Sequence, residues 1–132
     1  MWVYVDLHLP FKKGIKMSQQ VLFYNGSKEE NQCGGLPIYA RIVNSDGSLD
    51  NKKIKHISRH SPDGFQWGYG GSGPADAALS ILTHFVNFDS PQFKEQIETL
   101  YQRFKFDFIA QSPNNLYIER EGILKWLETN KK

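Results

Sequence analysis

Residues 65–76 constrain the fold of this chain more than any other stretch, because four glycines fall within six positions and a proline follows them. Such a density of glycine lets a backbone turn tightly and leaves its N–H groups uncovered. Pro74 suits the first position of a helix, because the N–H that proline lacks would have no partner there. The stretch therefore predicts a glycine loop that leads into a helix N-terminus, where free N–H groups and the helix dipole can bind an anion.

Helical spacing begins directly after that loop. Apolar residues recur every three or four positions over 74–88, 92–110 and 119–129, which predicts three amphipathic helices. Ser72 or Gly73 is the expected N-cap of the first helix. Asp76 is expected in the first turn of that helix, where a carboxylate interacts favourably with the dipole.

The N-terminal half has the pattern of a small sheet. Residues 20–26 have the composition of a strand that ends in an Asn-Gly turn, and apolar and polar residues alternate over 36–43 before a second turn signal. Residues 52–58 are expected to be a weaker strand, with Ile54 and Ile57 apolar. Residues 117–118 are expected to be short and extended. The predicted fold class is α+β, with an N-terminal antiparallel sheet of three to five strands followed by about three helices packed against it.

The first sixteen residues have two interpretations. Residues 1–10 alternate like an edge strand. Back-translation of residues 12–16 instead gives a purine-rich run just before the ATG of Met17, which resembles a bacterial ribosome-binding site. The predicted organisation is therefore an extension or extra strand over 1–16 and a single α+β domain over 17–132.

Composition argues against several classes of protein. The net charge of +2 does not favour nucleic-acid binding, and no apolar run is long enough to span a bilayer. The N-terminal residues lack the pattern of a signal peptide. Cys33 is the only cysteine, so no intrachain disulfide can form and a reducing, cytoplasmic location is expected.

The glycine stretch does not complete any of the known nucleotide or catalytic motifs. Gly68, Gly70 and Gly73 match G-x-G-x-x-G, but the βαβ unit that this fingerprint requires is missing. No Gly-Lys-Ser/Thr follows to make a phosphate-binding loop. Pro74 replaces the last glycine of a nucleophile elbow around Ser72, so Ser72 is not expected to be a nucleophile.

No catalytic residue, metal or cofactor is predicted. His56 and His60 are four positions apart, but that spacing binds a metal on a helix and this segment is predicted as strand and turn. His84 is expected to be a buried or flanking residue of the first helix. A nucleotide-processing enzyme with His60 or Asp76 as acid or base remains an alternative.

Two interpretations of the glycine stretch remain. In the first, the glycines only allow a tight crossing from sheet to helix, and the aromatic residues cover the core. In the second, loop N–H groups hold a phosphate while Trp67 or Tyr69 stacks on a base. Asp76 would repel a phosphate but can accept a hydrogen bond from a ribose hydroxyl. The candidate ligand-binding residues are Arg59, His60, Ser61, Trp67, Tyr69, Gly70, Gly71, Ser72, Gly73 and Asp76.

Residues 59–75 are similar to the signature of the domain of unknown function 6166, a family of bacteria and their phages. The later runs at 101–105 and 123–127 resemble the C-terminal half of that family. Gln66 stands where the family is expected to have a glutamate. The resemblance does not extend to residues 1–16, which favours the later start. The family itself brings no established chemistry.

The residues and the resemblance together lead to one hypothesis of function. The chain would be a phage-encoded protein that captures an ADP-ribose-type signalling molecule at the glycine loop and sequesters it from host defence. The link to defence rests on analogy with small phage proteins that act in this way. The rival is a protein–protein interaction module whose glycine loop is structural. A homodimer formed through the sheet edge is an expected assembly, and neither nucleic acid nor membrane is an expected partner.

Overall fold

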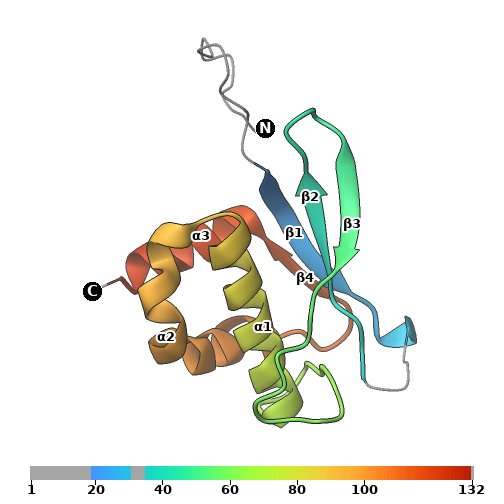
Figure 1. Cartoon of the computed structure of the whole chain (residues 1–132). Helices are drawn as coiled ribbons and strands as arrows, with labels where there is room; N and C mark the ends of the chain where they lie inside the picture. The colour runs from blue at the N-terminus through green and yellow to red at the C-terminus, as the bar shows by residue number, and fades with distance from the viewer. Residues whose placement is uncertain (1–18, 31–34, 132) are drawn as a thin grey trace.

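The computed structural model describes residues 19–30 and 35–131 (Figure 1). The predicted strand over 1–10, the start at Met17 and the lone Cys33 lie outside the described residues. Within the described ranges an antiparallel sheet is combined with three α-helices, which confirms the predicted α+β class.

The sheet has four strands in the order β3-β2-β1-β4, and each neighbouring pair is antiparallel. The strands are β1 (Gln20–Gly26), β2 (Tyr39–Val43), β3 (Leu49–Lys53) and β4 (Leu116–Glu119). β4 arises from the stretch that the sequence predicts only as short and extended. It pairs with β1 along its whole length, so the far end of the chain forms an edge of the N-terminal sheet.

The alternation predicted for β2 is present. Ala40 and Ile42 are buried, whereas Tyr39, Arg41 and Val43, which alternate with them, are half-buried. β1 also lies where it is predicted, with a shift in its pairing to β2 after Val21. One face of the sheet therefore supplies the core, as period-two alternation requires.

The third strand is predicted at the wrong residues: the apolar Ile54 and Ile57 place it at 52–58, whereas β3 spans Leu49–Lys53. The Asn44 N–H donates to the Ser48 carbonyl at 2.8 Å, and this tight turn sets Leu49 opposite Val43. The pairing then ends with Lys53 of β3, and the chain beyond it is irregular. Turn geometry, rather than the apolar residues downstream, fixes which residues of a hairpin pair.

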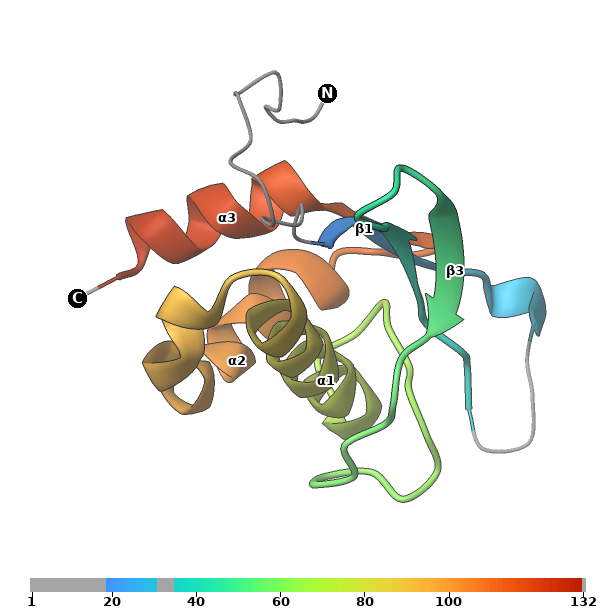
Figure 2. The same ribbon diagram turned by 45° about the horizontal axis from the view of Figure 1, so that its top comes forward.

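The three α-helices are α1 (Ser72–Phe88), α2 (Ile97–Phe104) and α3 (Arg120–Thr129). The second predicted helix is in fact three consecutive helical segments. A 3₁₀ segment over Pro91–Gln96 precedes α2, and a π-helical segment over Lys105–Ile109 follows it. Figure 2 shows the helices grouped to one side of the sheet.

The start of α1 differs from the prediction. The N-cap is Gly71, whose backbone is extended, and not Ser72 or Gly73. Pro74 is the third helical residue rather than the first. Proline is tolerated at this position because the N–H groups of the first turn have no partner within the helix. Asp76 consequently lies beyond the first turn.

The core lies between α1 and the sheet. Every residue of α1 from 73 to 82 is buried. Phe65 and Trp67, just before α1, are also buried, at 4% and 1% exposed. Among the helices of the described residues, none combines the length and the apolar character that crossing a bilayer requires.

Candidate functional site

The segment before the glycine loop is held in one shape by a single buried carboxylate. Asp76 is 0% exposed. It accepts hydrogen bonds from the backbone N–H groups of His60 at 2.8 Å, Ser61 at 2.9 Å and Arg59 at 3.2 Å. The His56 imidazole adds a fourth donor, with Nε2 at 2.9 Å from Oδ2. Asp76 thus organises the loop over 56–61 from inside the protein.

These contacts keep Asp76 ionised. Burial raises the pKa of this carboxyl, but the hydrogen bonds from His56 and from the N–H groups of Ser61, His60 and Arg59 together hold the pKa below its ordinary value. A carboxylate with a lowered pKa and four protein donors is a poor general base. It also has no exposed atom with which to meet a ligand.

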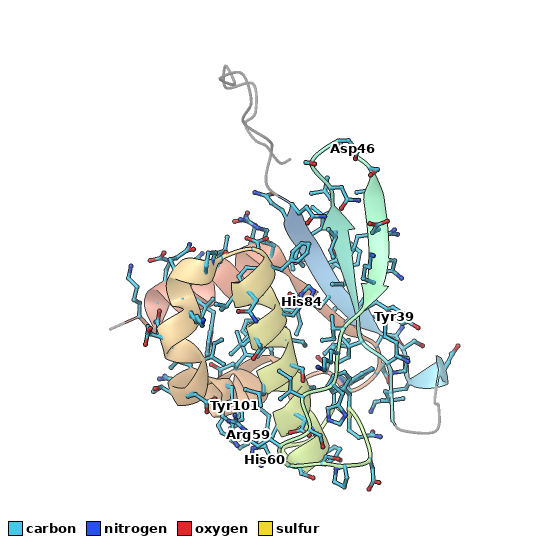
Figure 3. All side chains as sticks on the ribbon, in the orientation of Figure 1. Tyr39, Asp46, Arg59, His60, His84 and Tyr101 are labelled. Carbon is cyan, nitrogen blue, oxygen red and sulfur yellow. The ribbon has the colours of Figure 1, made fainter. Side chains whose placement is uncertain are left out.

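The loop presents two of the predicted residues on the surface, beside α2. His60 Nε2 lies 2.7 Å from the Tyr101 hydroxyl, and the two rings stack at 5.8 Å. The Arg59 guanidinium lies 5.7 Å from the centre of the same ring. Figure 3 shows Arg59, His60 and Tyr101 together at one end of the molecule. We call these three residues the Tyr101 cluster.

The guanidinium of this cluster is engaged by a carboxylate from α2. Arg59 binds Glu98 through two hydrogen bonds, at 2.7 and 3.0 Å. These bonds raise the pKa of the guanidinium and lower the pKa of the Glu98 carboxyl. The Glu98 side chain is 69% exposed, so solvent reaches this ion pair freely. Arg59 therefore already makes the two-pronged contact that it would make to a phosphate.

At the glycines of the loop, other side chains of the protein pack directly against the backbone. A Cβ at Gly70 would lie 2.8 Å from the Phe106 ring, and a Cβ at Gly71 would overlap the Tyr69 ring. A Cβ at Gly73 would lie 2.8 Å from the Gln66 Cβ. At these three positions glycine is explained by close packing, as in the structural interpretation of the loop.

The two aromatic residues proposed for stacking have different environments. Trp67 is in the core, and its Nε1 donates to the Asn114 carbonyl at 2.6 Å. Tyr69 is 52% exposed, and Phe106, which packs over the neighbouring glycine, is 53% exposed. In this conformation Tyr69 rather than Trp67 is accessible to a ligand. We call Tyr69 and Phe106 the exposed aromatic pair.

The remaining predicted residues lie around the start of α1. Ser72 is exposed, Gly73 is buried, and Ser61 is buried with its N–H on Asp76. Within the described ranges no side chain caps this helix. The structure therefore brings Arg59, His60 and Ser61 together through Asp76, but it separates Trp67 from them by burying it.

Sequence reasoning missed four residues of this region: His56, Glu98, Tyr101 and Phe106. Glu98 and Arg59 are 39 positions apart, so no local pattern indicates their contact. Nothing in the local sequence indicates that His56 donates to Asp76. The only available signal is that a buried carboxylate needs hydrogen-bond donors. In the part of the chain that is described, no group of three or more histidine, cysteine, aspartate or glutamate side chains could hold a metal ion.

Comparison with known proteins places the chain in a family. The model of the family of unknown function DUF6166 matches residues 24–129, so the chain belongs to this family, as its resemblance predicts. No curated protein and no solved structure matches the chain. Function must therefore be inferred from the site itself.

Proposed function

We propose that this member of the DUF6166 family binds a small nucleotide-derived anion at the Tyr101 cluster and holds it without turning it over. The observation that supports this most strongly is the buried Asp76 carboxylate, which fixes the backbone that carries Arg59 and His60. Burying a charge is costly unless it is fully hydrogen-bonded. Here the burial serves to hold a surface loop, which is what a preformed binding surface needs.

The chemistry of the cluster suits a phosphate attached to a flat ring. A guanidinium recognises phosphate through two parallel hydrogen bonds, and Arg59 makes the same contact to Glu98. An incoming phosphate would displace the exposed Glu98 carboxylate and keep the geometry of Arg59. Tyr69 adds an exposed ring near the start of α1 on which a base could stack.

Capture without turnover agrees with the state of the acidic and basic groups. Asp76 has its oxygens occupied by protein donors, and His60 Nε2 is bound to the Tyr101 hydroxyl. More specifically, we propose that the protein sequesters an ADP-ribose-type signalling molecule in the cytoplasm of a phage-infected cell. Such a protein needs tight binding and no acid–base machinery.

The test is calorimetric titration with ADP-ribose, cyclic ADP-ribose, NAD, AMP and inorganic phosphate. Arg59→Gln should weaken binding about tenfold or more, because it removes a charged donor. Glu98→Gln should tighten binding, because it frees the guanidinium. Arg103→Gln removes an equal charge from α2, the helix that carries Glu98 and Tyr101, and is the matched control. If none of the five probes binds, the proposal is wrong.

A second candidate, a protein–protein interaction module, is supported by the exposed aromatic pair and by the packing of the loop glycines. Tyr69 and Phe106 each expose about half of their surface beside tightly packed glycines. Exposed aromatic residues are enriched in interfaces. Sedimentation of the wild type and of the double variant Tyr69→Ser, Phe106→Ser would show whether the pair mediates self-association. A monomeric wild type would exclude the homodimer.

A further inference from the structure

A pocket of about 260 Å³ lies on the other half of α1, away from the Tyr101 cluster. It is formed between α1 and the irregular segment that follows β3. Ile57 and Phe88 give it apolar walls, and Lys55, His84 and Asn87 give it polar groups. Figure 3 shows His84 between α1 and the sheet, apart from Arg59, His60 and Tyr101.

The protonation of His84 follows from its partner in the core. Tyr24 is 0% exposed, and its hydroxyl lies 2.8 Å from His84 Nδ1. Burial and then the charge of Asp89 raise the pKa of Tyr24 well above its usual value, so the phenol keeps its proton. Nδ1 is the one partner of this hydroxyl among the described residues, so the O–H donates to Nδ1. The ring proton of neutral His84 is consequently on Nε2.

His84 lines the pocket, and its Nε2–H is a free donor. Within the described part of the chain it has no hydrogen-bond partner, and it is not one of the buried unpaired atoms, so solvent reaches it. Burial lowers the pKa of His84, which keeps the ring neutral and the donor in place near pH 7. Parallel stacking on Phe88 at 5.3 Å fixes the plane of the ring.

The other polar groups of the pocket are also able to donate. The Lys55 ammonium group has no ion-pair partner among the described residues. The Asn87 side chain adds an amide. Asp89, whose charge acts on both Tyr24 and His84, is itself paired with Arg120. The polar lining is therefore rich in donors and has one uncompensated positive charge.

We propose that this pocket is a second ligand site, which binds a small planar carboxylate. The flat body would lie between Ile57 and Phe88, and the carboxylate would accept from His84 Nε2–H and from Lys55. The volume is below the range typical of drug-sized ligands, so a single-ring or two-ring metabolite is the appropriate size. The inference does not depend on the proposed function of the Tyr101 cluster.

The probes for the test are benzoate and its uncharged isostere benzamide, followed by ¹H–¹⁵N NMR of the whole protein. Benzoate should shift the His84 Nε2–H signal and the backbone signals of Asn87 and of Thr83, which also lines the pocket. Lys55→Met should weaken benzoate binding about tenfold, because it removes one charged donor, and should leave benzamide binding unchanged. Lys52→Met removes a neighbouring exposed lysine and serves as the charge control.

A second variant tests the cavity without touching a charge. Thr83→Phe should fill the pocket and abolish binding of both probes, while the melting temperature shows that the chain is folded. The proposal is overturned if neither probe binds the wild type at millimolar concentration. It is also overturned if benzoate binding survives Thr83→Phe, or if Lys52→Met weakens it as much as Lys55→Met does.

Discussion

The two ends of α1 each carry a buried aspartate, and the two carboxylates have different tasks. Asp89 follows the last residue of α1 and accepts from the Val21 N–H at 2.9 Å and from the Arg120 guanidinium at 2.9 and 3.0 Å. Asp76, near the other end, accepts from three successive backbone N–H groups and from His56. One carboxylate joins β1, α1 and α3, whereas the other holds a single loop.

The comparison distinguishes a structural tie, by which we mean a carboxylate that joins elements of the core, from a carboxylate that holds a surface loop in place. Asp89 is balanced by a guanidinium, and its partners come from elements that form the core. Most partners of Asp76 are backbone groups of one loop, and that loop presents Arg59 and His60 to solvent. We infer that the Asp89 end of α1 fixes the fold and the Asp76 end fixes a site.

The largest effect is expected from Asp89→Asn. Removing one charge of a buried ion pair typically costs about 3–5 kcal/mol, and a loss of about 3 kcal/mol is expected here because the Asp89 side chain is 1% exposed but that of Arg120 is 23% exposed. The free energy of unfolding, measured in urea, should fall by that amount. Adding Arg120→Met should recover part of the loss. A loss below about 1 kcal/mol would mean that Asp89 is not a structural tie.

A smaller and local effect is expected from Asp76→Asn. One oxygen remains to accept, but the new NH₂ group faces donors, so the loss should be about 1–3 kcal/mol. Hydrogen exchange should accelerate at the N–H groups of residues 59–61 far more than in the sheet. If exchange instead accelerates evenly through the core, the distinction between the two ends of α1 does not hold.

At the N-terminal end of α1, which carries Asp76, Gly73→Ala should destabilise the protein more than Gly71→Ala. The new methyl at Gly73 would lie 2.8 Å from the Cβ and 3.2 Å from the backbone nitrogen of the half-buried Gln66, and such overpacking costs about 1–3 kcal/mol. At Gly71 the obstacle is the ring of the exposed Tyr69, which can turn away. Thermal unfolding of the two variants would measure the difference. Equal losses would show that the Tyr69 ring is as fixed as the core.

The smallest expected effect is on pH dependence. The pKa of Asp76 is lower in the folded than in the unfolded chain, so its contribution is complete above an unfolded pKa of about 3.9. That contribution is lost as pH falls through the lower folded pKa. The melting temperature of Asp76→Asn should therefore decline less steeply than that of the wild type on acidification. If the melting temperatures of the two proteins fall equally steeply with pH, the lowered pKa assigned to Asp76 is wrong.

Much of the fold is predictable because it depends on local patterns. The strands at 20–26 and 39–43 and the helical spacing after Pro74 are visible in the sequence. The sequence does not indicate that Trp67 is buried while Tyr69 is exposed. Two residues apart, they would share a face of an extended chain, but Gly68 between them has a φ of +94° and interrupts the extended backbone.

The candidate site was only partly predictable, for a related reason. Arg59 and His60 stand out as basic residues before a glycine loop. Their support from Asp76 and their contacts with Glu98 and Tyr101 join segments 15 to 41 positions apart. Contacts of this kind leave no periodic signal in a single sequence.

Titration of ADP-ribose into the wild type, Asp76→Asn and Arg59→Gln by calorimetry tests most directly whether the Asp76 end of α1 is a site. We expect the wild type to bind, Arg59→Gln to bind about tenfold more weakly, and Asp76→Asn to lose affinity through a less favourable entropy because its loop is no longer held. Equal affinity in all three proteins, or none in the wild type, would contradict a binding role for this end of the helix.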